Sequence, residues 1–198
     1  MKTSIKKIAL ALFAVILCLS FASCGNKDDY VPVGYKRVSN GNADHVLYVP
    51  ESWIVDMSTG VTTARVSKTD SSNISFMSFD LADFEAPTET EAATGETENQ
   101  PETDAIDDFW AYYSEEFKKT FPDITYDEDG YGVNMLVSKL AAKKYVYTAT
   151  VTGASYKFMQ RVVIKNDTVY LFTYTAKAEV YDTHEAEALK IAGYIEIK

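Results

Sequence analysis

Histidine and cysteine offer the most versatile side-chain chemistry in this 198-residue chain, which has two of each. His184 follows Asp182 and precedes Glu185 and Glu187, so one stretch offers the imidazole and carboxylate ligands that divalent metals accept. Position 188 is Ala, so the HExxH signature of zinc hydrolases is absent. Asp182 and His184 are therefore candidate metal ligands, and helix capping with solvent exposure is the alternative.

Other patterns of catalytic chemistry are missing. The sequence contains no GxSxG nucleophile motif and no glycine-rich phosphate loop. Asp127 begins a stretch that looks like a calcium loop, but Tyr131 and Ser138 occupy positions five and twelve, where calcium needs oxygen ligands and a Glu. We expect no enzyme activity and no cofactor.

The N-terminus has the features of an export signal. Three lysines precede an apolar segment at 8–19, which is shorter than the roughly 20 residues that a permanent membrane span needs. The following Ser-Phe-Ala-Ser-Cys resembles the lipobox of bacterial lipoproteins, although Phe21 stands where Leu is usual. We expect removal of residues 1–23 and lipid attachment to Cys24. An ordinary secretory signal, cut near Ala22 or Ser23, is the alternative.

Charge and cysteine content limit the function classes. Removal of the signal leaves Cys24 as the only cysteine, which excludes an intramolecular disulfide, a CxxC redox pair and a cysteine zinc site. The chain has 29 acidic and 19 basic residues, and three of the basic ones leave with the signal. Such an acidic surface argues against nucleic acid as a partner and against attachment to anionic lipid by charge. We expect a monomer, held by its lipid on the extracytoplasmic face of the cell membrane.

Composition divides the chain into segments. Residues 24–32 are polar and predict a short tether, and residues 33–198 predict one domain. Within it, residues 85–104 contain no aromatic and no branched aliphatic side chain. Such a segment buries too little apolar surface to offset its ordering entropy, so we expect a disordered acidic insertion. A partner-binding or cation-attracting arm is the alternative.

Periodicity predicts the secondary structure of the domain. Apolar residues recur every three to four positions at 106–121, which indicates an amphipathic helix. A second helix is expected at 183–192, with Asp182 as its cap and Glu185 completing a capping box. A turn is expected at Asp129–Gly132. The predicted strands span residues 35–38, 45–49, 61–67, 73–79, 133–140, 144–151, 156–165 and 168–176, with a short one around 195–197.

The 14 tyrosines and two tryptophans offer a different kind of candidate, because exposed aromatic rings favour ligand and partner contacts. Most of them occupy apolar-facing positions and are expected in the core. Trp53 and Tyr131 lie near predicted loops and are the candidate ligand-binding residues.

Two motifs resemble a known family. Val-Leu-Tyr-Val-Pro-Glu-Ser-Trp at 46–53 is similar to the strand that ends in Tyr-Pro-x-x-Trp in PsbP-like domains. Val-Tyr-Leu-Phe-Thr-Tyr-Thr-Ala at 169–176, followed by Tyr181, resembles the closing strand and helix of that family. The resemblance implies an α+β fold in which helices flank both faces of an antiparallel sheet, an α/β/α sandwich. It carries over no catalytic residue.

Two functions fit these features. The first is a membrane-anchored, non-catalytic binding or assembly module with a protein partner in the envelope. The alternative is a metal- or solute-binding lipoprotein associated with transport, which would use the acidic surface and His184.

Overall fold

The computed structural model describes residues 31–39, 43–58, 61–84 and 102–198. The predicted signal, most of the predicted tether and residues 85–101 of the predicted insertion lie outside this part. The elements run in the order β1 (Tyr35–Val38), β2 (His45–Pro50), β3 (Ile54–Asp56), β4 (Thr62–Arg65), β5 (Asn73–Asp80), η1 (Leu81–Phe84), α2 (Glu102–Thr120), β6 (Thr125–Val137), β7 (Leu140–Val151), β8 (Ala154–Lys165), β9 (Thr168–Lys177), η2 (Ala178–Val180), α3 (Tyr181–Gly193) and β10 (Glu196–Ile197).

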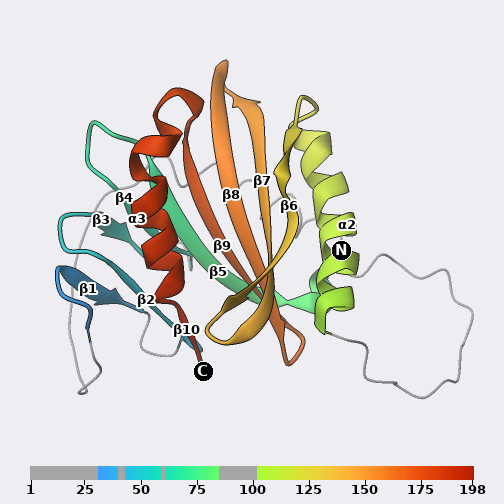
Figure 1. The fold of residues 1–198 in the computed structure, drawn as a ribbon, viewed down its shortest axis with the longest axis horizontal. Coiled ribbons are helices and arrows are strands. Elements are labelled where there is room, and N and C mark those ends of the chain that lie inside the picture. Colours follow the sequence, from blue (N-terminus) through green and yellow to red (C-terminus); the bar gives the residue numbers. More distant parts are fainter. Residues whose placement is uncertain (1–30, 40–42, 59–60, 85–101) are drawn as a thin grey trace, which may run out of the picture.

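Antiparallel sheets dominate the structure. Seven strands form one sheet in the order β3-β4-β5-β9-β8-β7-β6, and a second sheet has the order β1-β2-β10 (Figure 1). The strands predicted at 35–38 and 45–49 form an antiparallel pair, and so do those predicted at 61–67 and 73–79. The predicted α+β class with antiparallel sheets is therefore confirmed. The short strand β3 and the division into two sheets were not predicted.

Two-residue turns join the four long strands β6 to β9. Both residues of each turn have positive φ, with values of 52° and 67° at Ser138 and Lys139, 49° and 82° at Thr152 and Gly153, and 49° and 59° at Asn166 and Asp167. Such turns match the twist of the flanking strands. The continuous strand predicted at 133–140 is wrong, because the chain reverses at Ser138 and Lys139, two residue types that are not typical of this turn.

The turn predicted at Asp129–Gly132 is also wrong. These residues lie inside β6, where the pairing with β7 shifts register on both sides of Tyr131. A Cβ at Gly130 would lie only 2.7 Å from the Cβ of Val146 on β7, and Gly132 has a φ of 67°. Gly132 therefore belongs to a β-bulge, and Gly130 allows the close approach of β7. In the sequence, glycines in these two roles resemble the glycines of a turn.

Two apolar clusters form the core, and alternate residues of each long strand contribute to different clusters. The α2 cluster includes Ile106, Phe109, Trp110, Tyr113, Phe117, Tyr145, Tyr147, Phe158, Val162, Val169 and Leu171. The α3 cluster includes Leu47, Val49, Ile74, Met159, Val163, Phe172, Tyr174, Tyr181, Ala188, Ile191 and Ala192. Because the side-chain period of a strand is two, residues that point to opposite sides of the sheet supply the two clusters.

Helix α2 buries its aromatic stripe as its periodicity predicts. The ring of Trp110 stacks on Tyr145 of β7 with a centroid separation of 3.6 Å and an interplanar angle of 5°. The helix begins at Glu102, earlier than expected, so residues 102–104 of the predicted insertion are helical.

Helix α3 begins differently from its prediction. Its N-cap residue is Val180, with no side-chain capping bond, and Asp182 lies within the first turn. The capping box of Asp182 and Glu185 is therefore wrong, because η2 leads directly into the helix. A buried hydrogen bond attaches this end of α3 to the sheet, since the hydroxyl of Tyr174 donates to the carbonyl oxygen of Tyr181 over 2.7 Å.

Candidate functional site

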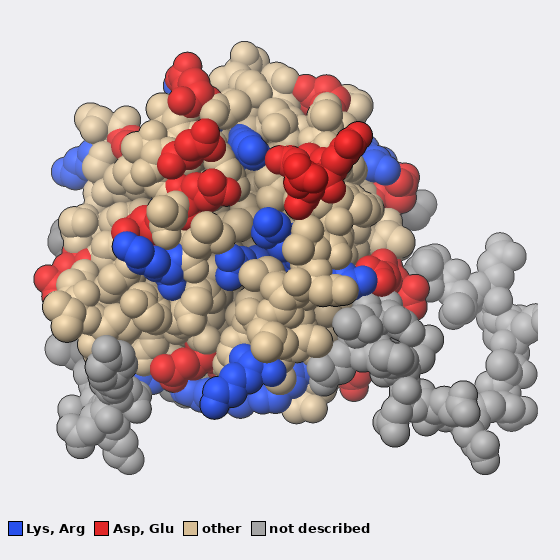
Figure 2. Space-filling view, in the orientation of Figure 1, with Lys and Arg blue, Asp and Glu red and all other residues tan. Residues whose placement is uncertain are grey.

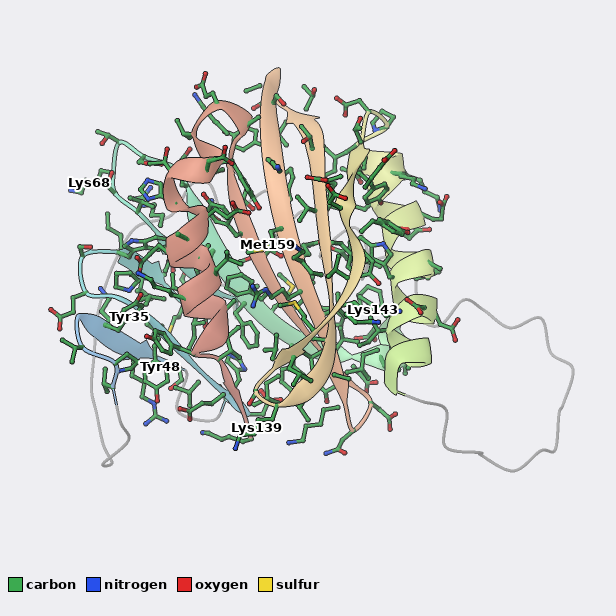
Figure 3. The ribbon with its side chains drawn as sticks, viewed as in Figure 1. Tyr35, Tyr48, Lys68, Lys139, Lys143 and Met159 are labelled. Carbon is green, nitrogen blue, oxygen red and sulfur yellow. The ribbon has the colours of Figure 1, made fainter. Side chains whose placement is uncertain are left out.

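Three basic side chains lie on β7 and β8, on the side of the sheet that α3 packs against. Lys144, Lys157 and Arg161 form what we call the central basic cluster. Figure 2 shows Lys and Arg atoms near the centre of this face, with acidic atoms around them. Met159, which lies between Lys157 and Arg161 on β8, is labelled at the centre of the same view in Figure 3. The cluster is unusual because the whole chain has a formal charge of −10.

Arg161 is the most deeply placed member of the cluster. Only 7% of its surface is exposed, and its Nε is buried without a hydrogen-bond partner among the described residues. Burial lowers the pKa of the guanidinium, although the nearby Tyr181 opposes this effect. A buried charge normally has an ion pair or several hydrogen bonds to offset its desolvation, and no described residue provides them for Arg161.

Lys144 lies next to Arg161 on the adjacent strand. The register of β7 and β8 places the two residues directly opposite each other, so their Cβ atoms are about 5 Å apart. Lys144 is half-buried and forms no ion pair with any residue that the structure describes. Like charges at directly opposed positions destabilise a sheet. The pair therefore concentrates positive charge at a place where the folded chain does not neutralise it.

Lys157 differs from the other two because it has partners. Its Nζ lies 3.5 Å from a carboxylate oxygen of Asp127 on β6 and 4.8 Å from the centre of the Tyr181 ring at the start of α3. These contacts show that the cluster is bounded by β6 on one side and by α3 on the other. The free positive charge is thus limited to Lys144 and Arg161.

The two predicted aromatic candidates lie apart from this cluster. Trp53 is 5% exposed and packs in the α3 cluster, where its ring meets His184 edge-on. A ligand contact at Trp53 stays a prediction. Tyr131 is 49% exposed at the β6 bulge, with its ring against Tyr126 and Tyr145. Tyr145 belongs to the α2 cluster, so the structure places Tyr131 on the other side of the sheet from Arg161. A ligand contact at Tyr131 stays a prediction.

The predicted metal ligands Asp182 and His184 both lie on α3, and a metal contact at either residue stays a prediction. In the described part of the chain, no three His, Cys, Asp or Glu side chains come together as metal ligands would. Asp182 is exposed, and the Nε2 of His184 lies 2.9 Å from a carboxylate oxygen of Asp70 in the loop between β4 and β5. The imidazole therefore links α3 to this loop, a role that the sequence pattern around 182–187 does not reveal.

This link predicts a specific acid sensitivity. Partial burial raises the pKa of Asp70, but hydrogen bonds from Ser72 and His184 outweigh it and bring the pKa below its ordinary 3.8. A carboxylate with a lowered pKa stabilises the fold above that value, and the contribution is lost as the pH falls through the folded-state pKa. We expect Asp70→Asn to lose about 1 kcal/mol of stability at pH 6, and the difference from the unmodified protein to shrink below pH 3.8.

Urea unfolding across this pH range measures the effect. Asp108→Asn is the matched control, since Asp108 is an exposed carboxylate on α2 that makes no hydrogen bond to another described side chain. A difference between Asp70→Asn and the unmodified protein that stays constant from pH 6 to pH 2.5 would contradict the assignment.

The sequence contained one signal for the cluster. Arg161 stands within a run of apolar residues in β8, at a position where the alternation places a core residue. Its proximity to Lys144 depends on the register of β7 and β8, which periodicity does not give.

Cys24, the predicted lipid attachment site, lies outside the described residues. No helix in the described ranges has the length and apolar character that crossing a membrane requires.

The fold is similar to several solved structures. LpqN of Mycobacterium tuberculosis, described as involved in cell envelope biogenesis, matches with a TM-score of 0.53 and 14% identity, over 83% of this chain and 90% of LpqN. Cyanobacterial PsbP from Synechocystis matches with a TM-score of 0.52 and 14% identity, over 89% of this chain and 98% of that protein. A protein of Bacteroides thetaiotaomicron matches with a TM-score of 0.50 and 13% identity, over 84% of this chain and 49% of the other.

Comparison of the sequence itself gives no relative, since no family model and no curated protein matches it. At 13 to 14% identity, the structural matches show the fold alone. The motifs at 46–53 and 169–176 predict the same fold from the residues. The described part of the chain therefore has a PsbP-like fold.

Proposed function

We propose that this protein is a bacterial lipoprotein that acts as a non-catalytic binding module on the extracytoplasmic side of the cell membrane. Its binding surface is the face between α3 and β6 that contains the central basic cluster. The observation that carries this proposal is the burial of Arg161 without a partner among the described residues. A buried charge that the fold does not neutralise is costly, and a bound group of opposite charge would offset that cost.

The chemistry of the cluster favours binding over catalysis. Lys144 and Arg161 are both hydrogen-bond donors with positive charge, and they can hold a group of opposite charge without a proton-transfer step. The fold of LpqN, a protein of envelope biogenesis, supports a role in the same compartment. We also infer the full sandwich, with α2 over one face of the large sheet and α3 over the other, since these helices contribute to different clusters.

Lipid attachment is the part of the proposal that a single substitution tests. We expect Cys24→Ser to leave the protein unprocessed and without lipid, because the thiol accepts the diacylglycerol group. Intact-mass measurement of protein extracted from membranes distinguishes the two forms. Cys18→Ser is the matched control, since Cys18 lies in the apolar segment that is removed. Normal acylation of the Cys24→Ser protein would refute the anchor.

Photo-crosslinking in intact cells tests the binding surface. Val133 lies opposite Lys144, on the side of the sheet that carries the basic cluster, whereas the exposed Leu136 points to the other side. A photoreactive residue at 133 should give an adduct of defined mass that the same residue at 136 does not give. Identical adducts at the two positions, or no adduct at 133, would count against this surface.

A further inference from the structure

We propose that Lys144 and Arg161 together form an oxyanion site, which binds a carboxylate or phosphate group of an organic ligand. This inference rests on the proposed function, because it names the chemistry that the surface between α3 and β6 recognises. Neither residue has an acidic partner in the described ranges, so both are available to the ligand.

The burial of Arg161 is the first reason. A guanidinium presents its N–H donors in a planar fork that matches two oxygens of a carboxylate or phosphate, and it is more weakly hydrated than an ammonium group. Only 7% of the surface of Arg161 is exposed to solvent. An oxyanion at this place would supply both the charge and the acceptors that the described part of the chain does not.

The position of Lys144 is the second and independent reason. The β7–β8 register places Lys144 directly opposite Arg161, where two like charges repel each other. An oxyanion between them replaces this repulsion by two attractions. A bound anion therefore stabilises an arrangement that is unfavourable when the site is empty.

The surroundings of the pair limit what else the ligand contains. Lys157 is bound to Asp127, so the site has two free cations in place of three. On β6, the other neighbour of β7, Val133 lies directly opposite Lys144, and 36% of its surface is exposed. The molecule that carries the oxyanion would thus contact an apolar side chain next to the ammonium group.

Matched variants on one strand test the site. Lys143 is adjacent to Lys144 but points to the other side of the sheet, toward α2, where it pairs with Asp107 (Figure 3). Lys143→Gln and Lys144→Gln therefore remove the same charge from opposite faces. Arg161→Gln removes the guanidinium.

The probes are sodium phosphate and sodium acetate, with sodium chloride at equal ionic strength as the reference. The full-length protein in detergent is titrated while its melting temperature and the Nε–Hε NMR signal of Arg161 are recorded. We expect a saturable shift of both with at least one oxyanion, unchanged by Lys143→Gln. Lys144→Gln should weaken the affinity at least tenfold, because it removes a charge-assisted hydrogen bond to the anion. Arg161→Gln should abolish the rise in melting temperature.

Several results would overturn the inference. These are the absence of a saturable shift in the unmodified protein, a shift that Lys144→Gln and Arg161→Gln leave unchanged, and an equal loss in Lys143→Gln. The relative affinity for phosphate and acetate identifies the source of the oxyanion. If no oxyanion binds but the adduct at position 133 persists, the oxyanion site is wrong and the binding module stands. If both fail, the surface itself is wrong.

Discussion

Replacement of Trp110 by alanine is expected to lower the free energy of unfolding by about 3–5 kcal/mol. The side chain is 3% exposed, and its indole ring stacks on Tyr145 and lies near the rings of Tyr113 and Tyr147. Alanine would remove the largest side chain that α2 contributes to its cluster and leave a cavity between helix and sheet. Denaturant unfolding followed by circular dichroism measures the loss.

Tyr131→Ala is the matched control for this experiment. The ring of Tyr131 also touches Tyr145, edge-on with a centroid separation of 5.4 Å, but half of the residue is exposed. We expect a loss of about 1 kcal/mol or less, since a side chain that solvent already reaches leaves no closed cavity. Equal losses for the two variants would show that α2 is not held by its aromatic stripe.

Replacement of Arg161 by methionine is expected to have the opposite sign and to stabilise the protein by about 1–4 kcal/mol in a buffer of Tris and chloride. Methionine keeps the apolar length of the side chain and removes a buried charge that no described residue neutralises. It also ends the repulsion between Arg161 and Lys144. Guanidinium-induced unfolding of both proteins, at low protein concentration and without added oxyanions, gives the difference.

Lys143→Met provides the contrast for this substitution. It also replaces a basic side chain by methionine, on the neighbouring strand, but it breaks the ion pair with Asp107. We expect no gain in stability, because Lys143 is already paired. A loss of stability in Arg161→Met would mean that the guanidinium is neutralised within the folded chain, and the proposed binding surface would lose its main support.

The sequence predicts most of this fold because its elements follow local patterns. The spacing of apolar residues alone predicts the helix with its aromatic stripe at 106–121 and the alternating strands. The errors in the strand predictions arose where residue type is a poor guide to turns and bulges. Gly130 and Gly132 serve a bulge where a turn was expected, and Ser138 with Lys139 form a turn without glycine or asparagine.

The candidate site was less accessible for a physical reason. Residue type identified Trp53, but only packing shows that its ring is buried. The importance of Lys144 and Arg161 comes from their cross-strand opposition and from the missing acidic partner, and both depend on contacts between residues 17 positions apart. A single sequence specifies the strands but not their register, so the pair is visible only in three dimensions.

The bulge in β6 has a consequence for how copies of this protein behave together. β6 is an outer strand of the large sheet, and an outer strand exposes backbone groups that another chain could pair with. The bulge interrupts this row of groups, and the adjacent Asp127, Glu128 and Asp129 add like charges that repel a second copy. The irregular, acidic strand thus disfavours edge-to-edge pairing between two copies of the protein.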